Sequence, residues 1–194
     1  MDFDEVVVKR RSIRKFKASP VPKEALRKIL DAGRWAPSAG NTQPWRFVVV
    51  TDTGVKEKIA RVCTEASRKA WAKFPPERAR YLAARGGSWD KSSMAKIPVL
   101  VVVCYEIPGW IREELALGSA WLAVENMLLA ATAEGLSSCI YTFYDLEEEN
   151  AVKAILGVPE KFRIAAIVQL GYATVEPPAP SRKALDEFVS YEHF

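Results

Sequence analysis

The stretch PSAGNTQPWRFVVVTD, residues 37–52, changes character part-way along. Its first part, PSAGNTQPW (37–45), combines prolines, a glycine and small polar side chains, which favours a loop over a helix or a core strand. The second part, RFVVVTD (46–52), is rich in β-branched residues and predicts a buried strand. A loop of this composition before a core strand is either a plain connection or a surface shaped to hold something flat and polar.

The rest of the chain predicts further helices and strands around this strand. Periodicity and capping residues predict helices at 3–10, from Pro22 to before Pro37, and at 54–72, 112–134 and 146–155. Strands are predicted at 97–106, 137–143 and 164–172. The order is not a clean βαβ series, so we expect an α+β fold layered around one central sheet. The helix at 112–134 is apolar around much of its circumference and should be buried on several sides.

Two segments fit this pattern less well. Residues 73–93, KFPPERARYLAARGGSWDKSS, mix Pro-Pro, Gly-Gly and charges, and predict the most irregular part of the chain. The Pro-rich stretch 176–181 predicts a linker or extended arm. The last residues, ALDEFVSYEHF (184–194), alternate enough to predict a strand that pairs elsewhere.

Length and composition narrow the class of protein. The 194 residues, 49% of them apolar, suit a single domain spanning 1–194. The net charge of +4 is modest, and no long run of Lys and Arg suggests a nucleic-acid partner. Three scattered cysteines and one histidine, His193, argue against a disulfide framework, a Cys/His metal site and a Ser-His-Asp triad.

The sequence shows no recognisable signal peptide, membrane helix or nucleotide-binding motif. The start MDFDEVVVKRR does not look like a signal peptide, and the apolar segment IPVLVVVCY (97–105) is too short for a membrane helix. We therefore expect a cytoplasmic protein with no membrane partner. No GxGxxG follows a predicted strand and no GxxxxGK[ST] occurs, which argues against a Rossmann site and a P-loop.

The run KRRSIRKF (9–16) follows the first predicted helix. In an extended chain Arg10, Ser12 and Arg14 point to the same side, because side chains alternate. Guanidinium groups offer forked donors to phosphate oxygens, so these residues are candidates for a phosphate site. Arg11 has the opposite parity. The alternative is a basic turn that faces solvent, as isolated charge runs usually do.

The loop 37–45 has side chains suited to a heterocycle. Asn41 and Gln43 can both donate and accept hydrogen bonds, which the edge of a ring with alternating C=O and N–H groups requires. Ser38 and Ala39 are small enough for a flat ring to approach the backbone. Taken alone, the loop would be an ordinary turn in most proteins.

Together these two segments resemble the FMN-dependent nitroreductase family. The resemblance rests on RRSxRxF, which begins at Arg10, and on PSxxNxQPWxFxVV, which begins at Pro37. Residues 118–139 are similar to the family's central helix and the strand after it, and residues 180–192 to its C-terminal arm. The resemblance covers essentially the whole chain and is weakest over 54–95. It implies a nitroreductase-like fold with a central mixed, mainly antiparallel sheet flanked by helices, a long buried central helix, and an arm at about 176–194 exchanged in a homodimer.

The resemblance also implies which residues contact FMN. Arg10 and Ser12 would bind the phosphate with help from Arg11, and Arg14 would lie near the pyrimidine edge, where a cation stabilises negative charge on the reduced ring. Loop residues would reach the flavin of the other subunit, because two cofactors lie at the homodimer interface. The implied contacts of the loop are Pro37, Ser38, Ala39 and Asn41, with Gln43 at the flavin edge or fixing the loop. The other implied contacts are Cys139, Ile140, Tyr141 and Thr142 on the N5 side, and Arg182 at the phosphate.

The chain departs from the family pattern at three places. Pro180 stands where many relatives have a second basic residue, so either Lys183 substitutes or the phosphate is held more lightly. The sequence GLSSCIYTF stands where relatives of one type have GLGxCWxG, and the bulkier surface near N5 should alter substrate choice. Gln43 stands where deiodinase-like relatives often carry Glu, which weakly disfavours that branch.

From this resemblance we expect an FMN-dependent oxidoreductase. It would pass hydride from NADH or NADPH through flavin N5 to a nitroaromatic, quinone or activated enone in a ping-pong cycle. No dedicated acid or base is needed, so we assign no catalytic side chain. Two alternatives stay open: different flavin chemistry of the same superfamily (flavin fragmentation, reductive dehalogenation or heterocycle dehydrogenation), or a non-catalytic flavin- or nucleotide-binding dimer. Tyr81, Trp89 and Trp110 are candidates to line a substrate pocket or simply to pack on the surface.

Overall fold

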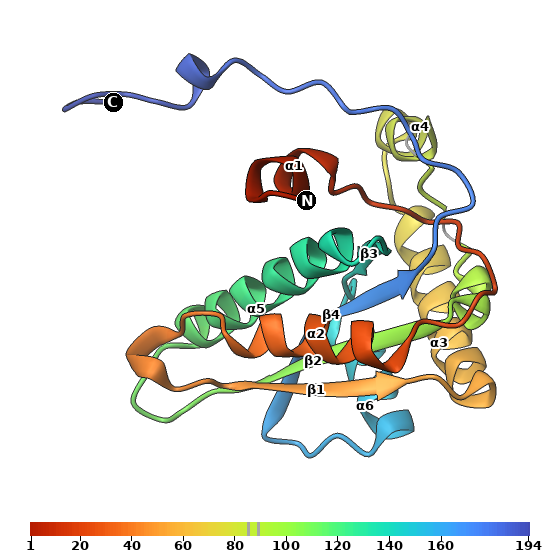
Figure 1. Cartoon of the computed structure of the whole chain (residues 1–194). Helices are drawn as coiled ribbons and strands as arrows, with labels where there is room; N and C mark the ends of the chain where they lie inside the picture. The colour runs from red at the N-terminus through yellow and green to blue at the C-terminus, as the bar shows by residue number, and fades with distance from the viewer. Residues whose placement is uncertain (85, 89) are drawn as a thin grey trace.

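The computed structural model describes residues 1–84, 86–88 and 90–194 (Figure 1). Every predicted helix and strand from 3 to 172 is present close to its predicted bounds. The helices are α1 (Phe3–Lys9), α2 (Lys23–Arg34), α3 (Thr53–Trp71), α4 (Pro76–Ala84), α5 (Glu113–Ala133) and α6 (Leu146–Leu156). The strands are β1 (Trp45–Val50), β2 (Val99–Glu106), β3 (Ser137–Tyr141) and β4 (Phe162–Gly171). Short 3₁₀ turns are η1 (Ala39–Asn41), η2 (Ser92–Lys96) and η3 (Leu185–Glu187).

Side chains at the helix ends explain several of these bounds. The carboxylates of Asp2, Asp52 and Asp145 each accept a hydrogen bond from the backbone three residues on, and so begin α1, α3 and α6. Gly135 follows α5 and Gly157 ends α6, both with positive φ. A residue without Cβ adopts that conformation at little cost.

The strands form one sheet in the order β1-β2-β4-β3, and all neighbouring strands run antiparallel. Trp45 at the start of β1 pairs with Tyr105 near the end of β2. A parallel bridge joins Ser12, after α1, to Ser138 of β3. This bridge lies outside the named strands, so the four-stranded sheet is antiparallel and not mixed as predicted, while the α+β fold predicted from the sequence is confirmed.

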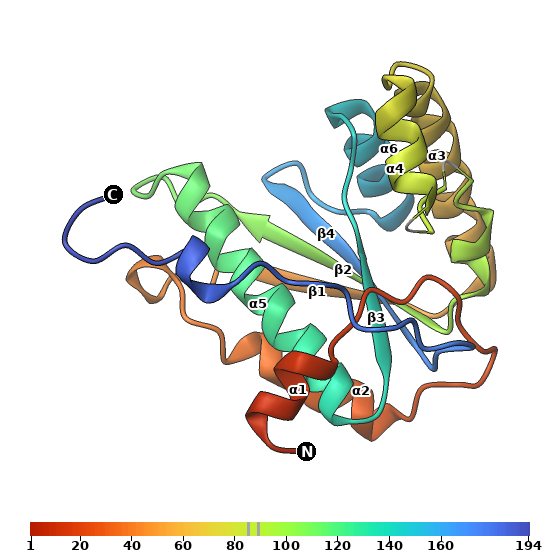
Figure 2. The same ribbon diagram turned by 90° about the horizontal axis from the view of Figure 1, so that it is seen from above.

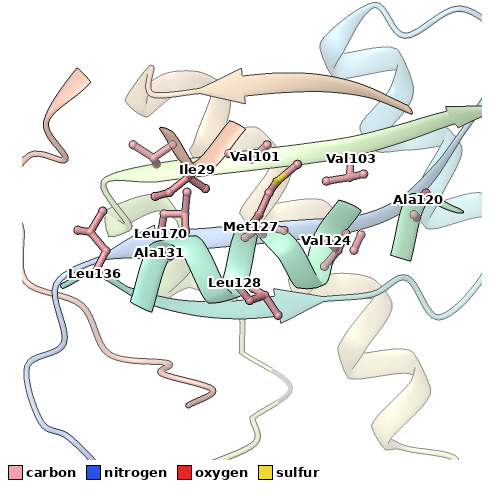
Figure 3. Close-up of a cluster of buried hydrophobic side chains, with 14 of the residues drawn as sticks. Ile29, Val101, Val103, Ala120, Val124, Met127, Leu128, Ala131, Leu136 and Leu170 are labelled. Atoms are coloured by element: carbon pink, nitrogen blue, oxygen red, sulfur yellow. The ribbon is translucent and has the colours of Figure 1, made fainter. Parts of the chain in front are cut away.

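Helices cover both faces of the sheet, as the view from above shows (Figure 2). On one face α5 and α2 pack on β2 and β4 through residues such as Ile29, Val124 and Met127 (Figure 3). Burial of their apolar side chains is the main force holding this layer together. The other face carries α3 and α6, with Ile59 and Val152 in its core. Both faces are thus filled by apolar side chains.

The central helix α5 is predicted from the sequence to be buried on several sides, and it is. Ala116, Ala120, Ala123 and Val124 lie among its fully buried residues. Among the described helices, α5 is the one that by length and composition alone could cross a membrane. Its contacts with β2, β3, β4 and α2 make it the core helix of this fold.

Two further expectations from the sequence are wrong. The segment 73–93 is not irregular throughout, because Pro76–Ala84 form α4; proline suits the first turn, and none of the helix's residues is buried. The alternating tail does not form a strand: residues 174–194 pair with no strand of the described chain and are exposed along their whole length. The tail's exposed apolar residues include Leu185 and Phe188, and the sheet β1-β2-β4-β3 takes up none of them.

Candidate functional site

A cavity of about 430 Å³ opens at the end of β3, between the segment after α1 and the segment before β2. Its floor is formed by side chains of β3 and β4, and its walls by residues from 14–16, 86–88 and 90–97. The lining residues are Arg14, Lys15, Phe16, Gly86, Gly87, Ser88, Asp90, Lys91, Ser93, Met94, Lys96, Ile97, Cys139, Ile140, Tyr141 and Gln169.

The cavity brings together four of the residues predicted from the sequence. Arg14 lies at its wall, and Cys139, Ile140 and Tyr141 lie at its floor, although 125 positions separate Arg14 from Cys139 in the sequence. Thr142, predicted with them, is exposed and lies outside the lining. The segment that carries Arg14 is held in place from both sides.

Backbone hydrogen bonds fix that segment. The N–H of Ile13 donates to the carbonyl of Ser138 at 2.9 Å, and Ile13 itself is buried. Farther on, the N–H of Lys17 donates to the carbonyl of Tyr172 at 2.8 Å. Arg14 is therefore presented to the cavity by a strand-like segment laid between β3 and the chain leaving β4.

Positive charge dominates the cavity. Arg14, Lys15, Lys91 and Lys96 line it, against the single carboxylate of Asp90 among the described lining residues. Burial lowers the pKa of the Lys91 ammonium, and the nearby Arg14 charge lowers it further. An anionic ligand in this cavity would relieve the repulsion between Arg14 and Lys91.

Tyr141 belongs to the floor of the cavity, and its hydroxyl is held by hydrogen bonds to buried side chains. The hydroxyl donates a short hydrogen bond to Glu148, a carboxylate that is 2% exposed, and lies 3.3 Å from the hydroxyl of Ser67. The second oxygen of Glu148 accepts the N–H of Tyr144 at 2.9 Å. Burial raises the pKa of Glu148 and also that of Tyr141. The Lys91 ammonium lies 5.7 Å from the centre of the Tyr141 ring, on its cavity side.

Cys139 shows the properties of a buried apolar residue. Burial raises the pKa of its thiol, and the positive charge of Arg14 offsets only part of that effect. A thiolate is the reactive form of cysteine, so a raised pKa argues against a nucleophile here. A small hydrophobic side chain in a strand is the more common state of such a cysteine.

Arg10 and Ser12, predicted to share one side with Arg14, are not among the residues that line the cavity. Arg10 forms an ion pair with Glu125 of α5 at 3.7 Å. The guanidinium of Arg11 instead donates to the carbonyls of Val8 and Arg10, which completes the end of α1. Arg11 lines a different, smaller cavity near Leu136, so its side chain is the one least suited to the ligand of the main cavity.

The loop 37–44 is rigid and lies elsewhere. The Ser38 hydroxyl accepts the N–H of Gln43 at 3.0 Å, and the Gln43 amide donates to the Asn41 side chain at 3.2 Å. The N–H of Ala39 donates to the hydroxyl of Ser119, in the first half of α5, at 3.2 Å. Asn41 and Gln43 both have positive φ, which is uncommon for residues with a side chain.

The strand register separates this loop from the cavity. The loop leads into Trp45, which pairs with Tyr105, whereas Ile97 at the cavity lies just before the opposite end of β2. At 3.2–3.4 Å per strand residue, the two ends are roughly 25 Å apart. The two motifs that together predict a flavin site therefore lie at opposite ends of one sheet within a single chain.

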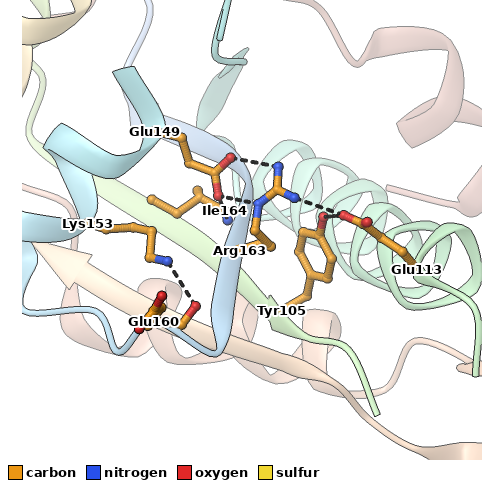
Figure 4. A network of polar contacts seen from close by, with 7 residues as sticks. All are labelled: Tyr105, Glu113, Glu149, Lys153, Glu160, Arg163 and Ile164. Carbon is orange, nitrogen blue, oxygen red and sulfur yellow. Dashed lines mark hydrogen bonds and ion pairs between the residues drawn. The ribbon is translucent and has the colours of Figure 1, made fainter. Parts of the chain in front are cut away.

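A charged network anchors the loop end of the sheet (Figure 4). Arg163 of β4 makes two hydrogen bonds to Glu149 of α6, at 2.9 and 3.0 Å, and a third to Glu113 of α5 at 3.0 Å. The Tyr105 hydroxyl also donates to Glu113, and the N–H of Ile164 donates to Glu149. This network joins β2, β4, α5 and α6, and so fixes both strand and helix ends around the loop.

The C-terminal residues predicted to contact phosphate make local interactions. Arg182 donates to the carbonyl of its neighbour Ser181, and Lys183 pairs with Glu187 at 3.6 Å. Both lie on the exposed arm, which runs across the molecule above β3 and α5 (Figure 2). Their contact with a phosphate stays a prediction.

Sequence reasoning missed most of the residues that line the cavity, and Gln169 and Lys91 are the most informative of these. Gln169 is a lone polar residue in the apolar strand IAAIVQLGY, 9% exposed and facing the cavity, and that break in the pattern was a usable signal. Lys91 lies in a segment without periodicity, so nothing local marked it. Trp89, a candidate for a substrate pocket, lies outside the described residues, and the exposed Tyr81 is not among the residues that line the cavity.

Comparison with known proteins places the chain in a family. The Nitroreductase family matches residues 7–172, which include the segment carrying Arg14, the loop and all four strands. The chain belongs to the nitroreductase family. This confirms the resemblance drawn from RRSIRKF and PSAGNTQPW.

Several relatives are similar over nearly their full lengths. An iodotyrosine deiodinase of Thermotoga neapolitana is 31% identical over 190 residues, 98% of this chain and 97% of that protein. An NADH dehydrogenase of Thermus thermophilus is 30% identical over 205 residues, 97% and 95% of the two chains. A crystal structure of oxidised iodotyrosine deiodinase bound to FMN and 3-iodo-L-tyrosine superposes with a TM-score of 0.88, at 30% identity and with both chains fully covered. Nitroreductase-family chains so similar to this one thus carry names for more than one chemistry.

Proposed function

We propose that this nitroreductase-family chain is an FMN-dependent reductase that uses NADH or NADPH to reduce a small, electron-poor organic acceptor. The observation that carries the proposal is the cationic cavity at the end of β3, where Arg14 meets Cys139, Ile140 and Tyr141. The sequence motifs predict the same four residues as flavin contacts. The relative whose crystal structure holds FMN supports the choice of cofactor.

The residues of the cavity fit FMN. Its volume, about 430 Å³, lies within the range of small-molecule sites, and its lining combines apolar floor residues with a few polar groups. The excess of cations suits an anionic cofactor. The chemistry that bound FMN would supply here is hydride transfer between a reduced nicotinamide and an electron-poor acceptor.

Each side chain then has a definite task. Arg14 would place a fixed positive charge against the ring edge that becomes electron-rich, and Arg10 with Ser12 would hold the phosphate. Tyr141, pinned by Glu148, would keep the floor rigid. Residues 86–88 and 90–94 would cover the cavity and exclude water from the reacting groups.

We further propose that the loop 37–43 completes the cavity of a second copy in a homodimer. Within one chain the loop lies at the Tyr105 end of β2, roughly 25 Å along the strand from Ile97 at the cavity. The face bearing α1, α5 and the arm exposes large apolar side chains, among them Phe3, Val8, Leu122 and Phe188. Apolar side chains concentrated on one face typically mark a surface that another protein covers.

The direct test is spectroscopic. The purified protein is mixed with FMN, freed of excess cofactor, and examined for bound flavin absorbance and for bleaching by NADH or NADPH. Nitrofurazone and menadione then serve as acceptors, with oxygen excluded. We expect stoichiometric FMN and acceptor turnover; a protein that takes up no FMN would overturn the proposal.

Reductive dehalogenation is the second candidate. Full-length similarity to iodotyrosine deiodinases favours it, and so does the adjacent pair Asp90 and Lys91 at the cavity, whose opposite charges match an amino acid's ammonium and carboxylate groups. The reaction would replace a carbon–iodine bond by carbon–hydrogen, using two electrons and a proton and releasing iodide. Incubation of the dithionite-reduced protein with 3-iodo-L-tyrosine distinguishes the candidates: release of L-tyrosine supports dehalogenation, and turnover of nitrofurazone alone supports the first proposal.

A further inference from the structure

Trp110 lies over the loop 37–44 in a position that neither of these proposals uses. It belongs to the connection between β2 and α5, and 69% of its surface is exposed in the single chain. A side-chain carbon added at Gly40 would lie 2.6 Å from the indole carbon Cη2. The indole therefore packs directly on the α-carbon of Gly40, which has no side chain to intervene.

The position of Trp110 is well defined by hydrogen bonds on both sides of it. Before Trp110, the N–H of Glu106 donates to the carbonyl of Pro44 in the loop at 3.0 Å. After it, Ser119 accepts the N–H of Ala39 at 3.2 Å and donates to Leu115 in α5. The loop is therefore tied to the chain on both sides of the connection that carries Trp110, and the indole packs on Gly40 within that frame.

We infer that Trp110 is a specificity-determining residue that forms an aromatic lid over the acceptor in the partner subunit's cavity. The inference rests on the proposed function, because the loop must reach that cavity. If it does, the indole on Gly40 arrives with it, and its exposed face is directed away from its own fold. An electron-rich indole would then stack on the ring of a planar, electron-poor acceptor, such as a nitroaromatic.

This arrangement explains why a large aromatic side chain stays exposed at a rigid position. An exposed tryptophan without a defined contact would not indicate a binding role. Here Gly40, with a φ of +56°, has no side chain, and this lets the indole of Trp110 approach the loop. The competing explanation is that Trp110 only buries apolar surface between the two chains. The two differ in what happens to acceptors of different shape.

The experiment compares two acceptors in the FMN-loaded enzyme. Nitrofurazone is planar and can stack, whereas ferricyanide is octahedral and accepts electrons without stacking. For Trp110→Ala we expect kcat/KM for nitrofurazone to fall about tenfold, as the loss of a stacked aromatic pair and its buried area implies, while ferricyanide is unaffected. Trp110→Phe should recover most of the loss, whereas Trp110→Leu, which keeps apolar bulk without a ring, should not.

Trp35→Ala is the matched control. Trp35 is also highly exposed, at 72%, and it lies just before the loop, where it stacks with the guanidinium of Arg34. Its substitution should leave both acceptors unchanged. The inference is overturned if Trp110→Ala changes both acceptors equally, if it changes neither, if Leu restores activity as well as Phe, or if Trp35→Ala gives the same loss.

The outcomes separate this inference from the proposed function. A wild-type protein that binds no FMN overturns the proposed function and the lid together. A wild-type protein that binds FMN and reduces both acceptors, with an unaltered nitrofurazone to ferricyanide ratio in Trp110→Ala, overturns only the lid.

Discussion

The cavity at the end of β3 and the loop 37–44 are built in opposite ways. The cavity is charged, and part of its wall comes from the segment 86–93, whose described residues are all exposed or half-buried. The loop is tied by hydrogen bonds to itself and to α5, and the Arg163 network braces the sheet beneath it. One end of the sheet thus carries a charged cavity, and the other carries a loop held by hydrogen bonds.

In the proposed homodimer, this difference means that a hydrogen-bonded motif of one chain would serve the cavity of the other. Both segments are predicted to contact FMN, the loop that of the other subunit, and within one chain they lie toward opposite ends of the sheet. Hydrogen bonding that holds Asn41 and Gln43 at positive φ makes sense if the loop must keep its shape inside another molecule. The substitutions below act on one region at a time.

Arg14→Ala in the cavity should have the largest effect. It removes a charge-assisted contact with an anionic ligand, so we expect FMN affinity to fall about 100-fold, equivalent to about 2.7 kcal/mol. Isothermal titration with FMN measures it. Arg11→Ala is the control, because the Arg11 guanidinium caps α1. The FMN affinity of this variant should stay within about threefold of wild type. Equal losses in both variants would show that the cavity is not the flavin site.

Arg163→Met at the loop end should weaken stability instead. It leaves Glu149, which is 4% exposed, with its charge uncompensated. Breaking a buried pair costs about 3–5 kcal/mol, and because Arg163 is partly exposed we expect about 2 kcal/mol, or a Tm lower by about 4–8 °C. Lys161→Met removes an exposed pair with Glu106 and should change Tm by about 1–2 °C at most. Similar shifts in both would contradict the bracing role.

Gly40→Ala tests the fit between the loop and Trp110. The new side chain must adopt a positive φ, at about 1 kcal/mol, and must also displace the indole. Gly135→Ala is the control, because Gly135 has a φ of +73° with open space around it. Urea unfolding should show a loss about 0.5 kcal/mol greater for Gly40→Ala. A smaller loss than in the control would mean that the indole moves aside freely.

Glu148→Gln behind the cavity floor should have the smallest effect, visible only through pH. Burial raises the folded-state pKa of Glu148 above its ordinary 4.5, so the folded protein binds this proton more tightly than the unfolded chain. The associated stability is present below pH 4.5 and is lost as pH rises through the folded-state pKa. Denaturation at a series of pH values should show that the variant loses less stability than wild type as the pH rises above 4.5. Parallel curves of stability against pH would contradict this role of Glu148.

Much of the fold could be predicted from the sequence because its signals are local. Apolar periodicity, Asp2 and Gly135 indicate the helices, and β-branched runs indicate the strands. The α4 helix was missed because its residues bury nothing, so they show no periodicity. The tail was assigned to a strand from alternation alone, but a strand also needs a partner edge, which no local pattern reveals.

The site was predictable only where a motif marked it. Arg14 and residues 139–141 were found because the two segments that carry them have a recognisable sequence pattern. Lys91 was missed because its place depends on how residues 86–97 cross the end of the sheet. The separation of the loop from the cavity also follows from strand register, which depends on pairing between distant segments.

One measurement tests most directly whether the site is shared between two chains. One variant, Arg14→Ala, damages the cavity; a second, Asn41→Gly with Gln43→Gly, strips the loop of its amides while keeping a backbone that tolerates positive φ. Each is expected to lose FMN as a homodimer. Heterodimers isolated with two affinity tags would contain one intact cavity facing one intact loop, and should bind about one FMN per two chains, half the wild-type amount. A heterodimer that binds no FMN, although both chains are folded, would show that each site is built within a single chain and would contradict this account.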